Sequence, residues 1–237
     1  MRFALRKIKQ KDGRGQAPPL QENKNKMKGI LITFEGIDYS GKTTQVKKLV
    51  SYLRRKGYKV ILLREPGGEK VSENIRQVLL ASKNTGMNPV TELLLYIASR
   101  AQLVSKIILP ALKNGKIVIC DRFYDSTLAY QGYGRGLDKK MIEYLNKIST
   151  LGIKPDLTIL IDIPIQVFVK RMRKNDKKKD RIEKEKVDFY KKVRDGYLKI
   201  ARREKKRFRV IDGSCEIDEI WSEVKKIADI FLKDRRY

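Results

Sequence analysis

The chain has 237 residues, and its 55 lysines and arginines against 28 acidic residues give a formal net charge of +27. It contains no histidine, which excludes imidazole catalysis and histidine-ligated metals, and two cysteines are too few for a disulfide framework or a zinc site. We find no apolar run of roughly 20 residues, as a membrane span needs, and no signal peptide. We therefore expect a soluble, cytoplasmic protein whose charge favours anionic partners.

Residues 1–28 differ from the rest of the chain. They are rich in Lys and Arg, contain two adjacent prolines and lack a periodic apolar pattern. Such a segment cannot bury enough apolar surface to offset the entropy lost on ordering. We predict a disordered basic tail over 1–28 and a single folded domain over 29–237.

From residue 29 on, short apolar runs that suit buried strands alternate with segments of helical periodicity. The predicted strands are 29–35, 59–63, 116–120, 157–161 and 208–211. The predicted helices are 42–56, 70–82, 88–114, 138–150, 164–174, 187–205 and 216–234. This alternation predicts an α/β fold, a five-stranded parallel sheet flanked by helices on both faces.

A phosphate-binding motif follows the first predicted strand and opens the first predicted helix. The sequence G-I-D-Y-S-G-K-T matches G-x-x-x-x-G-K-[ST], whose backbone N–H groups surround phosphate oxygens. In such loops the lysine reaches the β- and γ-phosphates and the last hydroxyl binds Mg²⁺. A chance glycine-containing turn is the alternative, but the flanking strand and helix favour binding of a nucleoside triphosphate by Gly36, Ile37, Asp38, Tyr39, Ser40, Gly41, Lys42, Thr43 and Thr44.

Two further polar motifs follow predicted strands. R-E-P-G-G begins at Arg64 and D-R-F begins at Asp121, each where a strand ends. The carboxyl ends of parallel strands line the binding crevice of an open α/β sheet, so both motifs are expected beside the phosphate loop. A guanidinium there suits a phosphate monoester because its planar fork binds two oxygens. Surface solvation is the alternative for Arg64 and Arg122.

Taken together, five motifs resemble those of the bacterial thymidylate kinases, over about residues 29–234. They are F-E-G-I-D-x-S-G-K-T-T-Q, R-E-P-G-G, A-S-R-A-Q, D-R-F-x-D-S-x-x-A-Y-Q-G and D-R-I-E, in the order of that family. The resemblance implies the P-loop nucleoside monophosphate kinase architecture and transfer of the γ-phosphate of ATP to dTMP, with Mg²⁺, by a homodimer. Another nucleoside monophosphate kinase is the alternative. A nucleic-acid-binding NTPase fits the charge, but no RNA- or DNA-binding motif is present.

The resemblance also implies the residues of the acceptor site. It places Arg122 and Arg76 at the phosphate of dTMP, with Asp38 and Glu65 near that phosphate and the sugar 3′-hydroxyl. The remaining implied residues meet the base and sugar: Tyr96, Arg100, Thr127, Tyr130 and Gln131. Apolar neighbours alone would favour a core position for Tyr96, but the arginine one helical turn later favours the pocket.

One residue of the phosphate loop departs from the family pattern. Tyr39 stands where bacterial members usually have Gly and where another branch has the Arg that supplies catalytic charge. The charge must then come from elsewhere, and the charged segment 171–186 resembles the family's arginine-bearing lid. Arg181 of D-R-I-E aligns with the lid arginine, and Arg171 and Arg173 are alternatives. A solvated helix end is the simpler reading of such a charge run.

The implied chemistry rests on four catalytic residues and two metal ligands. The catalytic residues are Asp38, Lys42, Arg122 and Arg181. Thr43 and Asp121 are the expected Mg²⁺ ligands, although Asp121 could instead orient Arg122. The expected dimer interface is the long apolar helix around residues 91–109, whose apolar surface is wider than one buried stripe requires.

Overall fold

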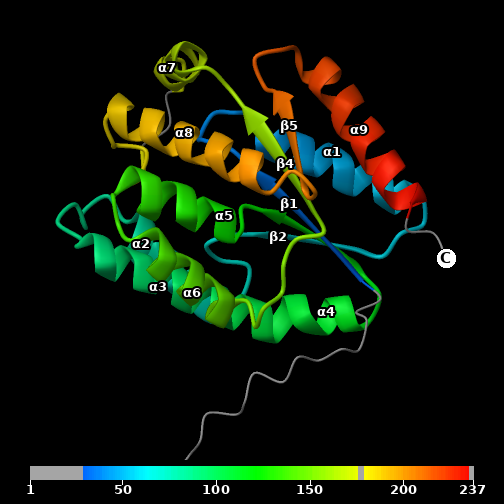
Figure 1. The fold of residues 1–237 in the computed structure, drawn as a ribbon, viewed down its shortest axis with the longest axis horizontal. Coiled ribbons are helices and arrows are strands. Elements are labelled where there is room, and N and C mark those ends of the chain that lie inside the picture. Colours follow the sequence, from blue (N-terminus) through cyan, green and yellow to red (C-terminus); the bar gives the residue numbers. More distant parts are fainter. Residues whose placement is uncertain (1–28, 176–178, 235–237) are drawn as a thin grey trace, which may run out of the picture.

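The computed structural model describes residues 29–175 and 179–234. The predicted tail, residues 1–28, lies outside this range, as do residues 176–178 of the charged segment. Five strands form one parallel sheet in the order β2-β3-β1-β4-β5, as predicted (Figure 1). They are β1 (Ile30–Glu35), β2 (Val60–Arg64), β3 (Ile117–Asp121), β4 (Leu157–Asp162) and β5 (Phe208–Asp212).

Helices cover both faces of this sheet. Alternate residues of a strand point to opposite faces, so adjacent Leu31 and Ile32 of β1 are both fully buried, in different cores. Ile32 packs in the core under α1 (Lys42–Arg55) and α9 (Ile217–Lys233). Leu31 packs in a core shared with the helices on the opposite face. On that face the helices are α2 (Lys70–Leu80), α3 (Pro89–Leu103), α4 (Leu109–Lys113), α5 (Tyr124–Thr127), α6 (Lys139–Ser149), α7 (Ile165–Arg173) and α8 (Val187–Arg203).

The predicted helix 88–114 is present but contains a wide turn. The segment η1 (Val104–Ile108) is a π-helix between α3 and α4, and the N–H of Leu109 donates to the carbonyl of Val104. Pro110 follows at once, has no N–H to donate, and crowds the preceding turn of a regular helix. A π turn there accommodates the proline without ending the helix.

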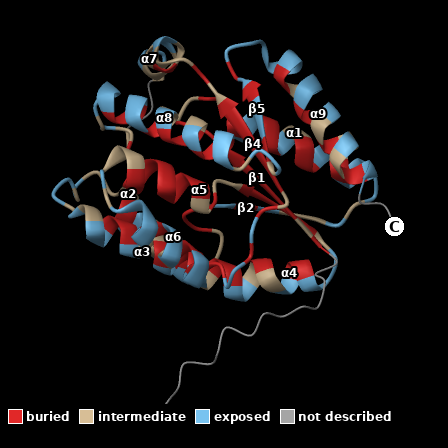
Figure 2. Ribbon diagram, viewed as in Figure 1, coloured by how far each residue is buried: buried red, intermediate tan, exposed pale blue. Residues whose placement is uncertain are grey.

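This continuous stretch, Pro89–Lys113, is long and apolar enough to cross a membrane by length and composition alone, which differs from the expectation drawn from the sequence. In the fold, its residues Leu93, Leu103 and Ile108 are buried against the other helices and the sheet. About 33% of its most apolar window is buried, so apolar side chains also face outward. Figure 2 shows that the outer sides of α2, α3 and α6 are largely exposed.

One helical segment was not predicted. Residues 124–134 form α5 followed by the π-helix η2 (Leu128–Gly134), although Gly132 and Gly134 are typical of a loop. Here glycine allows close packing. A Cβ on Gly134 would lie 2.6 Å from the ring of Phe189, and one on Gly196 would lie 2.7 Å from Tyr133. The missing side chains therefore let η2 and α8 approach each other closely.

Candidate active site

The phosphate loop leaves β1 and enters α1 as the motif predicts. Gly36 has φ of 141°, and a Cβ on it would lie 2.4 Å from the carbonyl oxygen of Ile161, so only glycine fits. The Oγ of Ser40 is buried and has no hydrogen-bond partner among the described residues. The side chain of Lys42 lies back over the loop, with Nζ 3.4 Å from the carbonyl oxygen of Ile37. Burial, and then Arg122, lower the pKa of Lys42. A bound anion would relieve both the unpaired hydroxyl and the desolvated ammonium.

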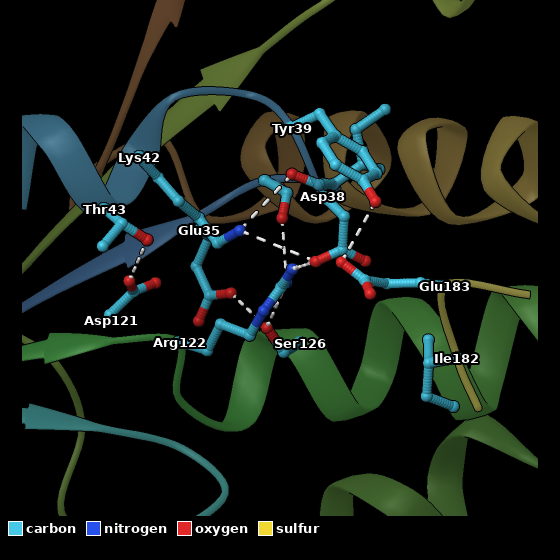
Figure 3. A network of polar contacts seen from close by, with 12 residues as sticks. Glu35, Asp38, Tyr39, Lys42, Thr43, Asp121, Arg122, Ser126, Ile182 and Glu183 are labelled. Carbon is cyan, nitrogen blue, oxygen red and sulfur yellow. Dashed lines mark hydrogen bonds and ion pairs between the residues drawn. The ribbon is translucent and has the colours of Figure 1, made fainter. Parts of the chain in front are cut away.

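Arg122 joins this loop to the end of β3. Its Nη2 lies 2.6 Å from Oδ1 of Asp38, and its Nη1 donates to the carbonyl of Gly36 at 2.8 Å (Figure 3). Arg122 has a left-handed φ of 71°, a conformation that costs a non-glycine residue energy and is often found at functional sites. Burial alone would raise the pKa of Asp38, but Arg122 and Lys42 hold it below its ordinary value. The centre of the site is therefore an ionised, paired carboxylate.

The two predicted metal ligands are also adjacent. Thr43 Oγ1 donates to Asp121 Oδ2 at 2.6 Å, which connects the first turn of α1 to the end of β3 (Figure 3). Within residues 29–175 and 179–234, no cluster of three or more acidic, Cys or His side chains could hold a metal by itself. A hydroxyl beside one carboxylate fits Mg²⁺, which is usually held by few protein oxygens together with phosphates and water.

A pocket opens next to Arg122, and all eight predicted substrate-binding residues line it. These are Glu65, Arg76, Tyr96, Arg100, Arg122, Thr127, Tyr130 and Gln131. Asp38 of the phosphate loop lines the same pocket. Residues that sequence reasoning did not single out for this pocket complete its wall: Pro66, Leu80, Phe123, Ser126, Asp180 and Ile182. The predicted donor loop and the predicted acceptor residues therefore form one continuous site.

Arg100 is fixed at the base of this pocket. It is 2% exposed and its Nε and Nη2 both contact Oε2 of Glu65, at 2.7 and 2.6 Å. Nη1 donates to Asn146 and Nη2 to Thr127, each at 2.9 Å. Burial raises the pKa of Glu65 despite this arginine, and Oε1 of Glu65 has no partner among the described residues. Tyr96 also lines the pocket, and burial raises the pKa of its hydroxyl.

Glu92 is a buried acceptor that the sequence analysis missed. It accepts from Gln131 at 2.7 Å, from Arg135 at 3.0 Å and from Arg181 at 2.6 Å, and it is fully buried. Burial would raise its pKa, but the hydrogen bonds from Arg135 and Gln131 lower it. A signal was available, because Glu92, Tyr96 and Arg100 recur every four residues on one helix face.

The arginines of the charged segment point in different directions. Arg181 lies against Glu92 and donates from Nε to the carbonyl of Leu79 at 2.7 Å, while its buried Nη2 has no described partner. Arg171 lies beside the phosphate loop and donates to the carbonyls of Tyr39 at 3.2 Å and Gly213 at 2.9 Å. Arg173 is exposed at the end of α7. Of the three, Arg171 is the one in contact with the phosphate loop.

A second buried acidic residue, Glu35, binds two of the side chains that contact Arg122. Glu35, the last residue of β1, accepts from Ser126 Oγ at 2.6 Å (Figure 3). It also accepts from the Tyr197 hydroxyl at 3.0 Å and from the N–H of Phe123 at 2.8 Å. Ser126 and Tyr197 in turn accept from Nη1 of Arg122 at 3.3 and 3.1 Å. Burial, and then Asp125, raise the pKa of Glu35 to about 8. Sequence reasoning treated Glu35 only as part of the motif.

Comparison with known proteins identifies the family of this chain. The family model described as thymidylate kinase matches residues 34–224. The thymidylate kinase of Thermoanaerobacter sp. (strain X514) is 50% identical over 206 residues, covering 87% of this chain and all of the relative. That of Kosmotoga olearia is 51% identical over 204 residues, covering 86% of this chain and 97% of the relative. The crystal structure of thymidylate kinase from Ehrlichia chaffeensis superposes with a TM-score of 0.69 at 41% identity, covering 85% of this chain and 98% of that one. The chain belongs to the thymidylate kinase family.

Proposed function

We propose that this protein transfers the γ-phosphate of ATP to dTMP, giving dTDP and ADP for dTTP biosynthesis. The observation that carries the proposal is the convergence of the predicted acceptor residues in one pocket that opens onto the phosphate loop. Asp38 belongs to both parts, and Arg122 pairs with it at 2.6 Å. Family membership supports the same reaction.

The phosphate loop would hold the triphosphate of ATP. Its N–H groups and the N-terminus of α1 favour anions, and Lys42 is placed to meet charge on the transferred phosphoryl. Thr43 and Asp121 would hold Mg²⁺ with the β- and γ-phosphates. When bound, this ion neutralises phosphate charge and aligns the reacting oxygens.

The pocket would hold dTMP with its phosphate toward Arg122 and Arg76. Tyr96 offers an aromatic face for the thymine ring, and stacking of this kind is worth about 1–3 kcal/mol per base. One N–H group of Arg100, on Nη1, is not used by the acceptors described above and is available to the base. Gln131 lines the same pocket, with its Nε2 bound to Glu92. The unpaired Oε1 of Glu65 can accept from the sugar 3′-hydroxyl.

The transfer needs no general base. The phosphate of dTMP is already largely ionised at neutral pH, since its second pKa is about 6. One of its oxygens forms a bond to the γ-phosphorus as the bond to the β,γ-bridging oxygen breaks and ADP leaves. Positioning and charge stabilisation supply most of the catalysis in such transfers. Arg122 contacts the phosphate loop and lines the acceptor pocket, so it would contact both phosphates.

We assign the additional catalytic charge to the 171–186 segment. Arg181, the predicted donor, has a buried Nη2 free of described partners, which an anion would satisfy. It is held by Glu92 in this structure, so it would reach the phosphates only after leaving that carboxylate. Arg171 already touches the loop carbonyl at Tyr39. Substituting the two arginines separately decides which of them acts.

A panel of acceptors tests the assignment. Initial rates of ADP release are measured with ATP·Mg²⁺ and, in turn, dTMP, dUMP, dCMP, dAMP, dGMP and UMP, and then with single-stranded DNA and RNA. We expect dTMP to give the highest kcat/KM, since Tyr96, Arg100 and Gln131 line the pocket where the base would lie. Preference for another monophosphate would identify a different kinase of this fold. ATP turnover that depends on nucleic acid would support the NTPase alternative.

We also propose that the protein acts as a cytoplasmic homodimer. Exposed apolar side chains gather on α2, α3 and α6, which lie side by side in Figure 1: Val71, Val78, Val90, Leu94, Met141, Tyr144 and Ile148. Tyr144 is 66% exposed and Leu94 is 50% exposed. A patch of this kind on one side of a domain marks an interface. Light scattering at micromolar concentration should report a dimer, and Leu94→Lys should shift it to the monomer.

A further inference from the structure

Tyr39 occupies a variable position of the phosphate-binding motif, but its backbone adopts a conformation that favours glycine. Its φ is 60°, in the left-handed region that favours glycine. The ring is half-buried and packs on Phe168 of α7, with the ring centroids 5.8 Å apart. A left-handed conformation is unfavourable for a bulky residue, so contacts of the Tyr39 side chain must offset its free-energy cost.

The hydroxyl of Tyr39 contacts both sides of the charged segment. It donates to Oε1 of Glu183 at 3.2 Å and accepts from Nδ2 of Asn175 at 3.2 Å. Figure 3 shows the tyrosine reaching from the phosphate loop to Glu183. The backbone carbonyl of the same residue accepts from Arg171 at 3.2 Å. One loop residue therefore binds three separate points of the segment that follows β4.

Glu183 links Tyr39 to the wall of the acceptor pocket. Its other oxygen accepts from the N–H of Asp180 at 3.0 Å, and Asp180 Oδ1 accepts from the N–H groups of Ile182 and Glu183 at 2.8 and 2.9 Å. The result is a tight turn whose members Asp180 and Ile182 line the pocket. Loss of the Tyr39 hydroxyl would therefore loosen the turn that forms this part of the pocket wall.

We propose that Tyr39 is a positioning residue that ties the phosphate loop to Glu183 and so holds the Asp180–Ile182 wall over the acceptor pocket. The proposal rests on the proposed function for what the pocket binds, but the contact itself does not depend on it. The contact joins the phosphate loop to the turn that lines the pocket, so it holds these two parts of the site together. Weakening it lowers the fraction of protein that is ready to bind, which raises apparent KM and leaves kcat at saturation nearly unchanged.

The test compares Tyr39→Phe with Tyr52→Phe in the full chain. Tyr52 makes the same kind of bond, donating to Asp229 at 2.7 and 2.8 Å between α1 and α9, and it does not line the pocket. Hydrogen–deuterium exchange is followed in the ligand-free protein at the hydrogen-bonded amides of residues 181, 184 and 185. Tyr39→Phe should speed this exchange about fivefold, the factor expected from losing one hydrogen bond. Tyr52→Phe should leave it unchanged.

Kinetics provide the second readout. Tyr39→Phe should raise KM for ATP and dTMP about two- to fivefold with kcat within about twofold of the parent, from the same hydrogen-bond loss. Glu183→Ala should raise KM at least as much, because it removes the bond from Tyr39 and also the acceptor of the Asp180 N–H. The double variant should raise KM by less than the product of the two single effects, because the Tyr39–Glu183 contact is shared.

Two results would overturn the proposal. The first is unchanged exchange at residues 181–185 in Tyr39→Phe. The second is a fall in kcat at constant KM, which indicates loss of active protein. If dTMP is not the acceptor, the exchange experiment still decides whether Tyr39 holds the wall, so the failure of one assignment is distinguishable from that of the other.

Discussion

Replacing Arg122 with lysine keeps the positive charge but removes the planar fork. In the structure the guanidinium reaches four acceptors at once: Gly36 at 2.8 Å, Ser126 at 3.3 Å, Tyr197 at 3.1 Å and Asp38 at 2.6 Å. A lysine ammonium on a flexible stem cannot satisfy these acceptors and also bind two oxygens of a phosphate.

The expected loss is at least one charged hydrogen bond to the phosphate of dTMP, worth about 1.5–3 kcal/mol. This corresponds to a fall in kcat/KM of roughly 10- to 150-fold. Steady-state kinetics with dTMP as the varied substrate measure it, and thermal unfolding confirms that the variant is folded.

Arg207→Lys is the matched control for the lost fork. Arg207 binds both oxygens of buried Asp125, at 2.7 and 2.9 Å, and does not line the pocket. This variant should lose stability while its kcat/KM stays within about twofold of the parent, because no substrate contact changes. If a folded Arg122→Lys protein keeps kcat/KM for dTMP within about threefold, the placement of the acceptor phosphate is wrong.

Three further predictions follow from the site. Lys42→Ala should lower kcat at least about 100-fold without unfolding the protein, the usual loss for a donor to transition-state charge. Arg181→Ala should lower both kcat and the melting temperature, because it breaks the buried ion pair with Glu92. Arg171→Ala should lower kcat alone. Unchanged kcat in both variants and in the double variant would show that the 171–186 segment takes no part in catalysis. Glu35→Gln should flatten the pH dependence of stability in urea unfolding. With its pKa raised to about 8, native Glu35 stays protonated while the unfolded residue ionises near 4.5, so the parent loses stability from about pH 4.5 to 8 and the variant loses less.

The sequence predicts those parts of the site that depend only on strand and helix periodicity and on the spacing of residues within a motif. Strand and helix periodicity place Arg64 and Asp121 at strand ends, where the sheet brings them together. The four-residue spacing of Tyr96 and Arg100 places both on the pocket side of α3. These predictions hold because they need only the local conformation and the rule that parallel strands align their ends.

The parts that were missed depend on contacts between distant segments. Arg181 pairs with Glu92, which is 89 residues away in the sequence. Because both side chains are buried, this ion pair determines where the Arg181 guanidinium lies. Asn146 fixes Arg100 from a separate helix, with no motif to mark it. The helical segment over residues 124–134 contains glycines, which are typical of loops. Only the close packing of this segment against α8 explains why glycine suits a helix there.

The most direct test of the account is a crystal structure of the protein with dTMP and a non-hydrolysable ATP analogue. We predict the thymine ring against Tyr96 and within hydrogen-bond distance of Arg100, and the phosphate of dTMP at Arg122 facing the γ-phosphate above Lys42. Binding of dTMP outside this pocket, or with its phosphate turned away from Arg122, would contradict the central claim that the phosphate loop and this pocket form one phosphoryl-transfer site.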